Sequence, residues 1–112
     1  MAAEGRVLVT ITWHANPLRG DRFAAAWLPS AEAVVDFGAD WWGFFRAYEG
    51  GADFIQAAIF PSKDHFERYW YSERIAEARA QASGLFQIPV LPEFHTILGE
   101  GVAAGASAAA AR

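Results

Sequence analysis

Two runs of aromatic and β-branched residues, DWWGFFRAYEG and DFIQAAIF, follow each other in the middle of the chain and meet near Gly50-Gly51. Their composition is typical of β-strands, and the glycine pair between them predicts a hairpin. Both alternating faces of the first run carry aromatic rings, so neither face suits water. The chain must therefore fold so that this hairpin is covered on both sides.

Composition narrows the class of protein. The 112 residues fit one domain, and with 54% hydrophobic and 20% charged residues the chain is too apolar for disorder. No unbroken apolar run approaches the roughly 20 residues of a membrane helix, and the N-terminus lacks a secretory apolar stretch, so we expect a soluble, cytoplasmic protein without a membrane partner. The net charge of −4 disfavours nucleic acid as a partner. Without cysteine, disulfides, thiolate catalysis and Cys-ligated metals are excluded.

The N-terminal third predicts a strand followed by a helix. In RVLVTITW the residues Val7, Val9, Ile11 and Trp13 alternate with Leu8, Thr10, Thr12 and His14. Apolar residues then recur at helical spacing from Phe23 to Val34, interrupted by Pro29. Proline there predicts either a kink or two short helices, the second starting near Ser30.

The C-terminal half predicts helical structure and a last strand. Ser62 is typical of a helix start and Gly84 of a helix end. Between them, the helical spacing of the apolar residues shifts by about one position at Ser72. This predicts a break with a second helix over 73–82, and a single bent helix is the alternative. LFQIPVLP reads as an extended connector and EFHTILG as a strand, so the domain spans 1–99. The Ala/Gly-rich tail, 100–112, has little to bury.

The order β-α-β-β-α-β predicts an α+β, ferredoxin-like fold, in which two helices cover one face of a four-stranded antiparallel sheet. The second face then has no cover from its own chain. We expect its members to be Leu8, Thr10, Thr12, Phe54, Gln56, Ala58 and Phe60. Such a face is too apolar to leave in water, so a homodimer is predicted.

The passage FIQAAIFPSKDHFERYWYSERIAEA resembles dimeric α/β-barrel proteins of the antibiotic-biosynthesis-monooxygenase type. The resemblance rests on Phe60 at the strand end, the turn Ser62-Lys63-Asp64 and the step Ser72-Glu73, and it covers roughly residues 6–99. It implies two sheets closing a barrel across a dimer. The cavity of such barrels is used for cofactor-free oxygenation of aromatic polyketides, for cyclisation, for haem breakdown or for no known chemistry. This chain departs from the pattern with DWWG in place of a Pro-Gly strand opening, and with Pro29.

His14 and His95 are the candidate catalytic residues. They end one strand and begin another, and these strands are antiparallel neighbours in the predicted fold, so we expect both imidazoles at the same end of the sheet. A histidine tuned by Asp53 or Glu49 suits general acid/base chemistry, whereas the alternative is an edge or interface histidine. Because the histidines have no metal-binding spacing, no metal site is predicted.

The candidate ligand contacts are mainly aromatic. Trp42, Arg46 and Tyr48 share one face of the predicted second strand, which lines either a pocket or a dimer seam. Arg46 can hold a phenolate or carboxylate, or pair with a nearby acid. Gln56 either hydrogen-bonds across the sheet or contacts a ligand.

The predicted helix after Ser62 adds three further candidates. His65 is either solvated or paired with Tyr69 for proton transfer, and Tyr69 and Trp70 complete the candidate substrate contacts.

Two functional hypotheses follow. One is a cofactor-independent enzyme that oxygenates or cyclises a hydrophobic aromatic or polyketide-like substrate, with His14 or His95 as base and Arg46, Gln56 or an indole N–H stabilising the oxyanion. The other is a non-catalytic dimeric barrel that binds a small apolar ligand. A void of at least about 300 Å³ reached by a histidine and Arg46 favours the enzyme, and a barrel filled by its own rings favours the binding protein.

Overall fold

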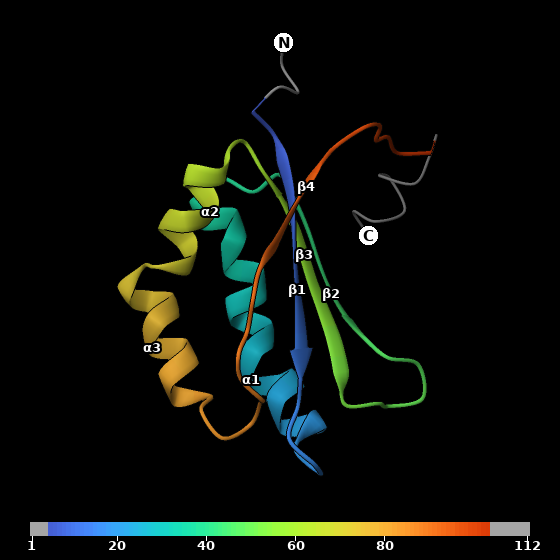
Figure 1. The fold of residues 1–112 in the computed structure, drawn as a ribbon, viewed down its shortest axis with the longest axis vertical. Helices are drawn as coiled ribbons and strands as arrows, with labels where there is room; N and C mark the ends of the chain where they lie inside the picture. Colours follow the sequence, from blue (N-terminus) through green and yellow to red (C-terminus); the bar gives the residue numbers. More distant parts are fainter. Residues whose placement is uncertain (1–4, 104–112) are drawn as a thin grey trace.

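The computed structural model describes residues 5–103, so the start of the chain and the tail from 104 to 112 lie outside the described residues. The elements are β1 (Val7–His14), α1 (Gly20–Glu32), the 3₁₀ helix η1 (Ala33–Phe37), β2 (Trp41–Arg46), β3 (Asp53–Phe60), α2 (Lys63–Trp70), α3 (Glu73–Gln81) and β4 (Glu93–Thr96). Their order and arrangement confirm the predicted ferredoxin-like α+β fold (Figure 1). None of the helices in residues 5–103 has the length and apolar character needed to cross a membrane.

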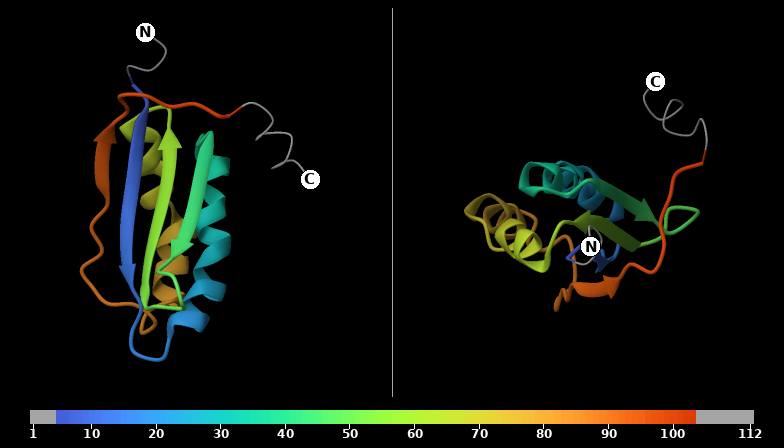
Figure 2. Two further views of the ribbon diagram at one scale, coloured as in Figure 1. Left: turned by 90° about the vertical axis from the view of Figure 1, so that its right-hand side faces the viewer. Right: turned by 90° about the horizontal axis from the view of Figure 1, so that it is seen from above.

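The four strands form one antiparallel sheet in the order β2-β3-β1-β4. The helices lie on one face of this sheet and leave the other face open (Figure 2). The pairing of β2 with β3 confirms the predicted hairpin. The core lies between the helices and the sheet, where Trp13 packs against Trp27 with ring centroids 4.7 Å apart.

Two serines begin the C-terminal helices as predicted. Ser62 Oγ accepts the backbone N–H of His65 at the start of α2, and Ser72 Oγ accepts that of Ile75 at the start of α3. A serine cap satisfies an otherwise unpaired donor in the first turn. The predicted break at Ser72 is therefore confirmed, and the single bent helix is not observed.

Proline does not divide the first helix. The expectation of a second helix starting near Ser30 is wrong, because α1 is continuous through Pro29 and only afterwards tightens into η1. Proline removes one donor, but Trp27 and Ala31 on either side are fully buried against the core. Their packing holds the helix across the missing hydrogen bond.

The expected orientation of β3 is also wrong. Trp13 pairs with Phe54 and Ile11 with Gln56, and paired residues in an antiparallel sheet point to the same face. The second-face candidates Phe54, Gln56, Ala58 and Phe60 therefore all face the helices. Ile55, Ala57 and Ile59 occupy the opposite face in their place.

The open face consists of four rows of side chains that run across the strands. The first row, at the end where β1 pairs with β4, contains Trp41, Ile59, Leu8 and His95. The second contains Gly43, Ala57, Thr10 and Glu93, and the third contains Phe45, Ile55 and Thr12. The fourth row, next to the turn between β2 and β3, contains Asp53 and His14. The ring of Phe45 lies over Gly43, where an added Cβ would come within 2.4 Å of it. Trp41, Phe45 and Ile55 remain 45%, 51% and 49% exposed, so the face is substantially apolar.

Candidate functional site

Gln56 is the hub of a buried polar network between the helices and the sheet. Its Oε1 accepts hydrogen bonds from Trp13 Nε1 at 3.1 Å and Trp27 Nε1 at 2.9 Å, and its Nε2 donates to Tyr69 Oη at 3.0 Å. The Tyr69 hydroxyl in turn donates to the Ser30 carbonyl at 2.7 Å. Of the two roles predicted for Gln56, the structure shows hydrogen bonding within the core.

This network belongs to a core filled by its own side chains. Trp13, Trp27 and Tyr69 are completely buried, and Gln56 is 3% exposed. Burial raises the pKa of Tyr69 to about 12, because a phenolate would lose its hydration there, and the hydrogen bond from Gln56 opposes this only in part. Tyr69 is therefore a neutral hydrogen-bonding group at physiological pH.

Arg46 connects the hairpin to the start of α1. Its Nε donates to the Gly51 carbonyl at 2.7 Å, its Nη2 to the Gly50 carbonyl at 3.1 Å, and its Nη1 to Asp21 Oδ1 at 2.8 Å. The guanidinium also lies 5.1 Å from the centre of the Phe54 ring. The acid that pairs with Arg46 is thus Asp21, and neither Glu49 nor Asp53 takes that place.

The other three candidate ligand contacts lie apart from one another. Trp42 lies on the helix side of β2 and borders a groove next to Arg74. Tyr48 is almost fully exposed in the hairpin turn. Trp70 is buried in α2, with the Arg79 guanidinium 4.2 Å from its ring centre. Only Gln56 and Tyr69 of the six predicted ligand residues hydrogen-bond to each other.

His14 forms a hydrogen-bonded pair with Asp53 on the open face. The two residues are directly opposite each other in the β1–β3 ladder, and His14 Nδ1 lies 2.8 Å from Asp53 Oδ1. A carboxylate accepts here, so Nδ1 carries the proton and Nε2 is left as an acceptor. Asp53, one of the two acids considered for this role, orients a histidine that can take up a proton.

His95 lies far from His14. It pairs with Leu8 in the β1–β4 ladder, six residues along β1 from His14, which is roughly 20 Å at about 3.3 Å per residue. The expectation that both imidazoles lie at the same end is therefore wrong. Both side chains do belong to the open face, and His95 Nε2 is hydrogen-bonded to Thr10 Oγ1 at 2.8 Å.

His65 takes part in the cap of α2. Its Nδ1 lies 2.7 Å from Ser62 Oγ, and its ring lies next to Gly38. The half-buried ring is not hydrogen-bonded to Tyr69, whose hydroxyl contacts Gln56 and Ser30. The structure thus shows no proton-transfer pair between His65 and Tyr69.

A groove opens at the Leu8 end of the open face. After β4, the segment 97–102, which we call the strap, crosses the end of the sheet towards β2 (Figure 2). The strap groove has a volume of about 510 Å³ and is lined by Arg6, Leu8, Asp40, Trp41, Ile59, Glu100, Gly101 and Val102. His95 is the cross-strand neighbour of Leu8 but does not line the groove.

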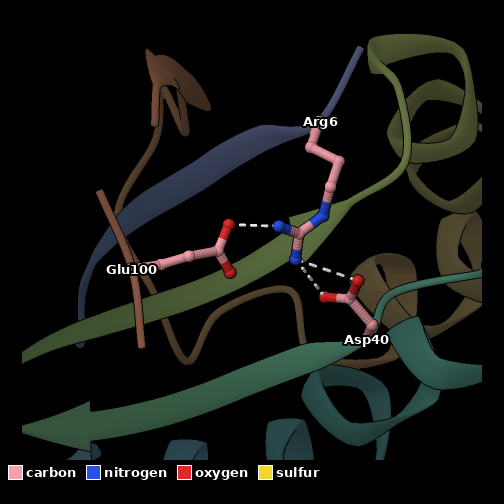
Figure 3. Close-up of polar contacts among 3 residues, drawn as sticks. All are labelled: Arg6, Asp40 and Glu100. Atoms are coloured by element: carbon pink, nitrogen blue, oxygen red, sulfur yellow. Dashed lines mark hydrogen bonds and ion pairs between the residues drawn. The ribbon is translucent and has the colours of Figure 1, made fainter. Parts of the chain in front are cut away.

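Arg6 fixes the strap. Its Nη2 donates to both oxygens of Asp40 at 2.9 and 3.0 Å, and its Nη1 donates to Glu100 (Figure 3). The hydrogen bonds to Glu100 and Asp40 raise the pKa of Arg6. Sequence reasoning missed this cluster, because 94 residues separate Arg6 from Glu100 and the tail was expected to bury little.

No three histidine, aspartate or glutamate side chains come close enough to hold a metal ion within residues 5–103. The pairs His14–Asp53 and His95–Thr10 are the histidine contacts on the open face. The chemistry these groups offer is proton transfer and hydrogen bonding.

Comparison with known proteins shows a shared fold. No family model matches the sequence, and a search of curated proteins also finds no match. Among solved structures, Rv0793 from Mycobacterium tuberculosis superimposes with a TM-score of 0.73 at 16% identity, covering 88% of this chain and 100% of that one. The cofactor-independent oxygenase SnoaB from Streptomyces nogalater gives 0.72 at 11% identity, covering 86% and 96%. An antibiotic biosynthesis monooxygenase-like protein from Caulobacter crescentus gives 0.73 at 15% identity, covering 88% and 94%.

Proposed function

We propose that two copies of this chain pack their open faces together, and that the dimer is a cofactor-independent enzyme acting on a hydrophobic aromatic or polyketide-like substrate. The observation that carries the proposal is the His14–Asp53 pair at the end of a largely apolar sheet face. The fold shared with a cofactor-independent oxygenase supports the reaction class by analogy.

The dimer is inferred from the open face. Trp41, Phe45 and Ile55 are each about half exposed in the single chain, and exposed apolar side chains gathered on one face mark an interaction surface. Strands β2 and β4 are the sheet edges and leave backbone groups unpaired. A second copy covers the apolar rows, and its edges can pair with these edges.

The proposed chemistry begins with proton removal. His14 Nε2 takes a proton from a phenol or an activated C–H, while Asp53 stabilises the imidazolium through Nδ1. The resulting carbanion transfers an electron to dioxygen, and recombination forms a C–O bond. The His14 imidazolium returns its proton to the peroxide anion, which gives a hydroperoxide. Loss of water then leaves a carbonyl, so a CH₂ group and O₂ become C=O and H₂O. Without dioxygen, the same carbanion can close a ring by aldol addition.

Sedimentation velocity at micromolar concentration tests the dimer. We expect twice the 12.2 kDa mass of one chain for the wild type and a single-chain mass for the double variant Phe45→Lys/Ile55→Lys. Val35→Lys, an equally exposed apolar residue on η1, is the matched control and should remain dimeric. A monomeric wild type would refute the dimer.

Oxygen uptake tests the reaction. The protein is incubated in air with anthrone and with a panel of naphthols, and oxygen consumption is compared with product formation. We expect equimolar consumption that falls about 10²–10⁴-fold in His14→Ala, the usual range for loss of a general base. If His14→Ala and His95→Ala both retain wild-type rates, neither histidine is the base.

A second candidate function is a non-catalytic dimer that binds a small apolar ligand. The specific observation in its favour is the core between helices and sheet, which Trp13, Trp27 and Tyr69 fill completely. Arg46 is also held by the hairpin and Asp21, away from the strap groove. Native mass spectrometry that finds a co-purified apolar ligand, together with an absence of oxygen uptake, would favour this function.

A further inference from the structure

We propose that a groove between α1 and α3 binds a small carboxylate with an apolar body. The two helices lie side by side on the helix side of the sheet (Figure 2). The space between them, which we call the helix groove, has a volume of about 710 Å³, within the range of roughly 300–1,000 Å³ that is usual for small-molecule sites. Its lining includes Arg22, Ala26, Pro29 and Ser30 on α1, Ala78 on α3, and Leu85 after it.

Much of the helix groove is lined by apolar side chains. Ala26 and Pro29 contribute from α1 and Ala78 from α3, and Leu85 adds a larger apolar side chain. The small side chains leave room between the helices. This surface suits an aromatic or alkyl body, and the polar groups beside it determine which kind of ligand can bind.

Ser30 places a hydroxyl group without a partner in the helix groove. The residue is only 9% exposed, and its Oγ has no hydrogen-bond partner within residues 5–103, whereas its carbonyl accepts from Tyr69. Every fully inaccessible side-chain nitrogen or oxygen in that part of the chain has a partner, so the Ser30 hydroxyl is accessible from the groove that it lines. Polar groups in such enclosed positions are normally hydrogen-bonded. The Ser30 hydroxyl can donate to an acceptor on a ligand.

Arg22 gives the helix groove a positive charge. It is the only charged residue of the lining in the described part of the chain, and no carboxylate of residues 5–103 forms an ion pair with it. The neighbouring acid, Asp21, accepts from Arg46 instead. A guanidinium can bind a carboxylate through two parallel hydrogen bonds, and it repels an ammonium group. The groove therefore favours a carboxylate over an amine of the same size.

The helix groove is separate from the face that the proposed dimer covers. Its residues lie on the helix side, whereas the His14–Asp53 pair belongs to the open face of the sheet (Figure 2). A second copy on the open face therefore leaves the helix groove free. The inference extends beyond the proposed function, and its test depends neither on oxygen uptake nor on dimerisation.

Binding is measured on the full chain with three probes that share a naphthyl body: naphthylacetate, naphthylacetamide and naphthylmethylammonium. Titration calorimetry gives the affinities, and NMR locates the probe through the methyl groups of Ala78 and Leu85 in the groove and of Ile55 on the open face. We expect the carboxylate to bind at least threefold more tightly than the amide and at least tenfold more tightly than the ammonium, and to shift the Ala78 and Leu85 signals. Absence of binding, equal affinities, or a shift of Ile55 without Ala78 and Leu85 would overturn the proposal.

Three variants test the residues of the helix groove. Arg22→Gln should weaken naphthylacetate at least threefold and remove its preference over the amide. Ser30→Ala should also weaken naphthylacetate at least threefold. Ala26→Leu places a larger side chain in the groove and should weaken all three probes at least fivefold.

Each variant has a matched control at an exposed position outside the groove lining: Arg68→Gln on α2, Ser83→Ala after α3 and Ala76→Leu on α3. The controls should bind naphthylacetate like the wild type. If they weaken binding as much as their counterparts, the helix groove is not the site. If Ser30→Ala fails to fold, Arg22→Gln and the wild-type methyl shifts decide the question.

Discussion

Replacing Gln56 by leucine removes the acceptor for two buried indole groups. Gln56 Oε1 accepts from Trp13 and Trp27, while leucine has a similar volume and no polar atom. The Tyr69 hydroxyl still donates to Ser30, so the main loss is two unpaired N–H groups. Each unpaired buried donor costs about 1–3 kcal/mol, which gives about 2–6 kcal/mol for the pair. That is a large part of the stability of a domain, typically about 5–15 kcal/mol.

The measurement is equilibrium urea denaturation followed by far-UV circular dichroism, because the substitution perturbs the indoles that dominate fluorescence. Chain concentration is held constant so that any association contributes equally. We expect a lower midpoint for Gln56→Leu with an unchanged slope against urea concentration. Gln87→Leu, at an exposed glutamine, is the control and should change stability by no more than about 0.5 kcal/mol.

The opposite result would be equally informative. If Gln56→Leu is as stable as the wild type or more stable, the two indoles do not depend on the amide. A gain in stability is typical of removing a polar residue that a protein keeps for binding or catalysis. Gln56 would then return to the set of ligand-binding candidates.

Three further perturbations address the core, a helix cap and the open face. Tyr69 has a folded-state pKa of about 12 against an ordinary value of 10.0, so its contribution to stability is complete below pH 10 and is lost as the pH rises to 12. The free energy of unfolding should fall by about 2–3 kcal/mol over this range, at about 1.4 kcal/mol per pKa unit. Urea denaturation at a series of pH values should show this fall in the wild type and not in Tyr69→Phe. Ser72→Ala removes the acceptor for the Ile75 N–H and should cost about 0.5–2 kcal/mol in thermal or urea unfolding, whereas unchanged stability would mean that the cap is dispensable. Gly43→Ala places a methyl group against the Phe45 ring and should lower the free energy of unfolding by about 1 kcal/mol. NMR contacts between that ring and residue 43 should be lost, and a ring that stays in place would contradict the described packing.

Local signals predicted most of the fold. The alternation of β1 placed Trp13 on the buried face, and the phase change at Ser72 placed a helix boundary at the residue that caps α3. Each of these predictions depends on residues a few positions apart in the sequence. Over that distance the backbone geometry of a strand or a helix determines which side chains share a face.

The face of β3 could not be predicted in the same way. Phe54 and Phe60 lie on one of its sides and Ile55 and Ile59 on the other, so alternation does not distinguish the buried side. The sequence predicts Gln56 on the second face, but its amide is buried because two indoles and a tyrosine from separate elements satisfy it. Such partners are visible only once the elements have packed.

Long-range register limited the prediction of the site. Strand β4 pairs through only four residues, and Gln87 of the preceding connector already bonds to the His14 carbonyl. The connector therefore occupies the part of β1 where His95 was expected, and His95 pairs with Leu8. A four-residue strand carries too little alternation to reveal this offset, and the contact between Arg6 and Glu100 left no local signal either.

Trp13 and His14 stand next to each other on the central strand with their side chains on opposite sides of the sheet. If β1 paired with β3 one residue out of register, the Trp13 indole would lie in water without its amide acceptor. The His14 imidazole would then be buried among the aromatic rings of the core. A shifted register is thus penalised by the pairing of β1 with β3 alone. Strand β4 can be short, because the register of β1 does not depend on it.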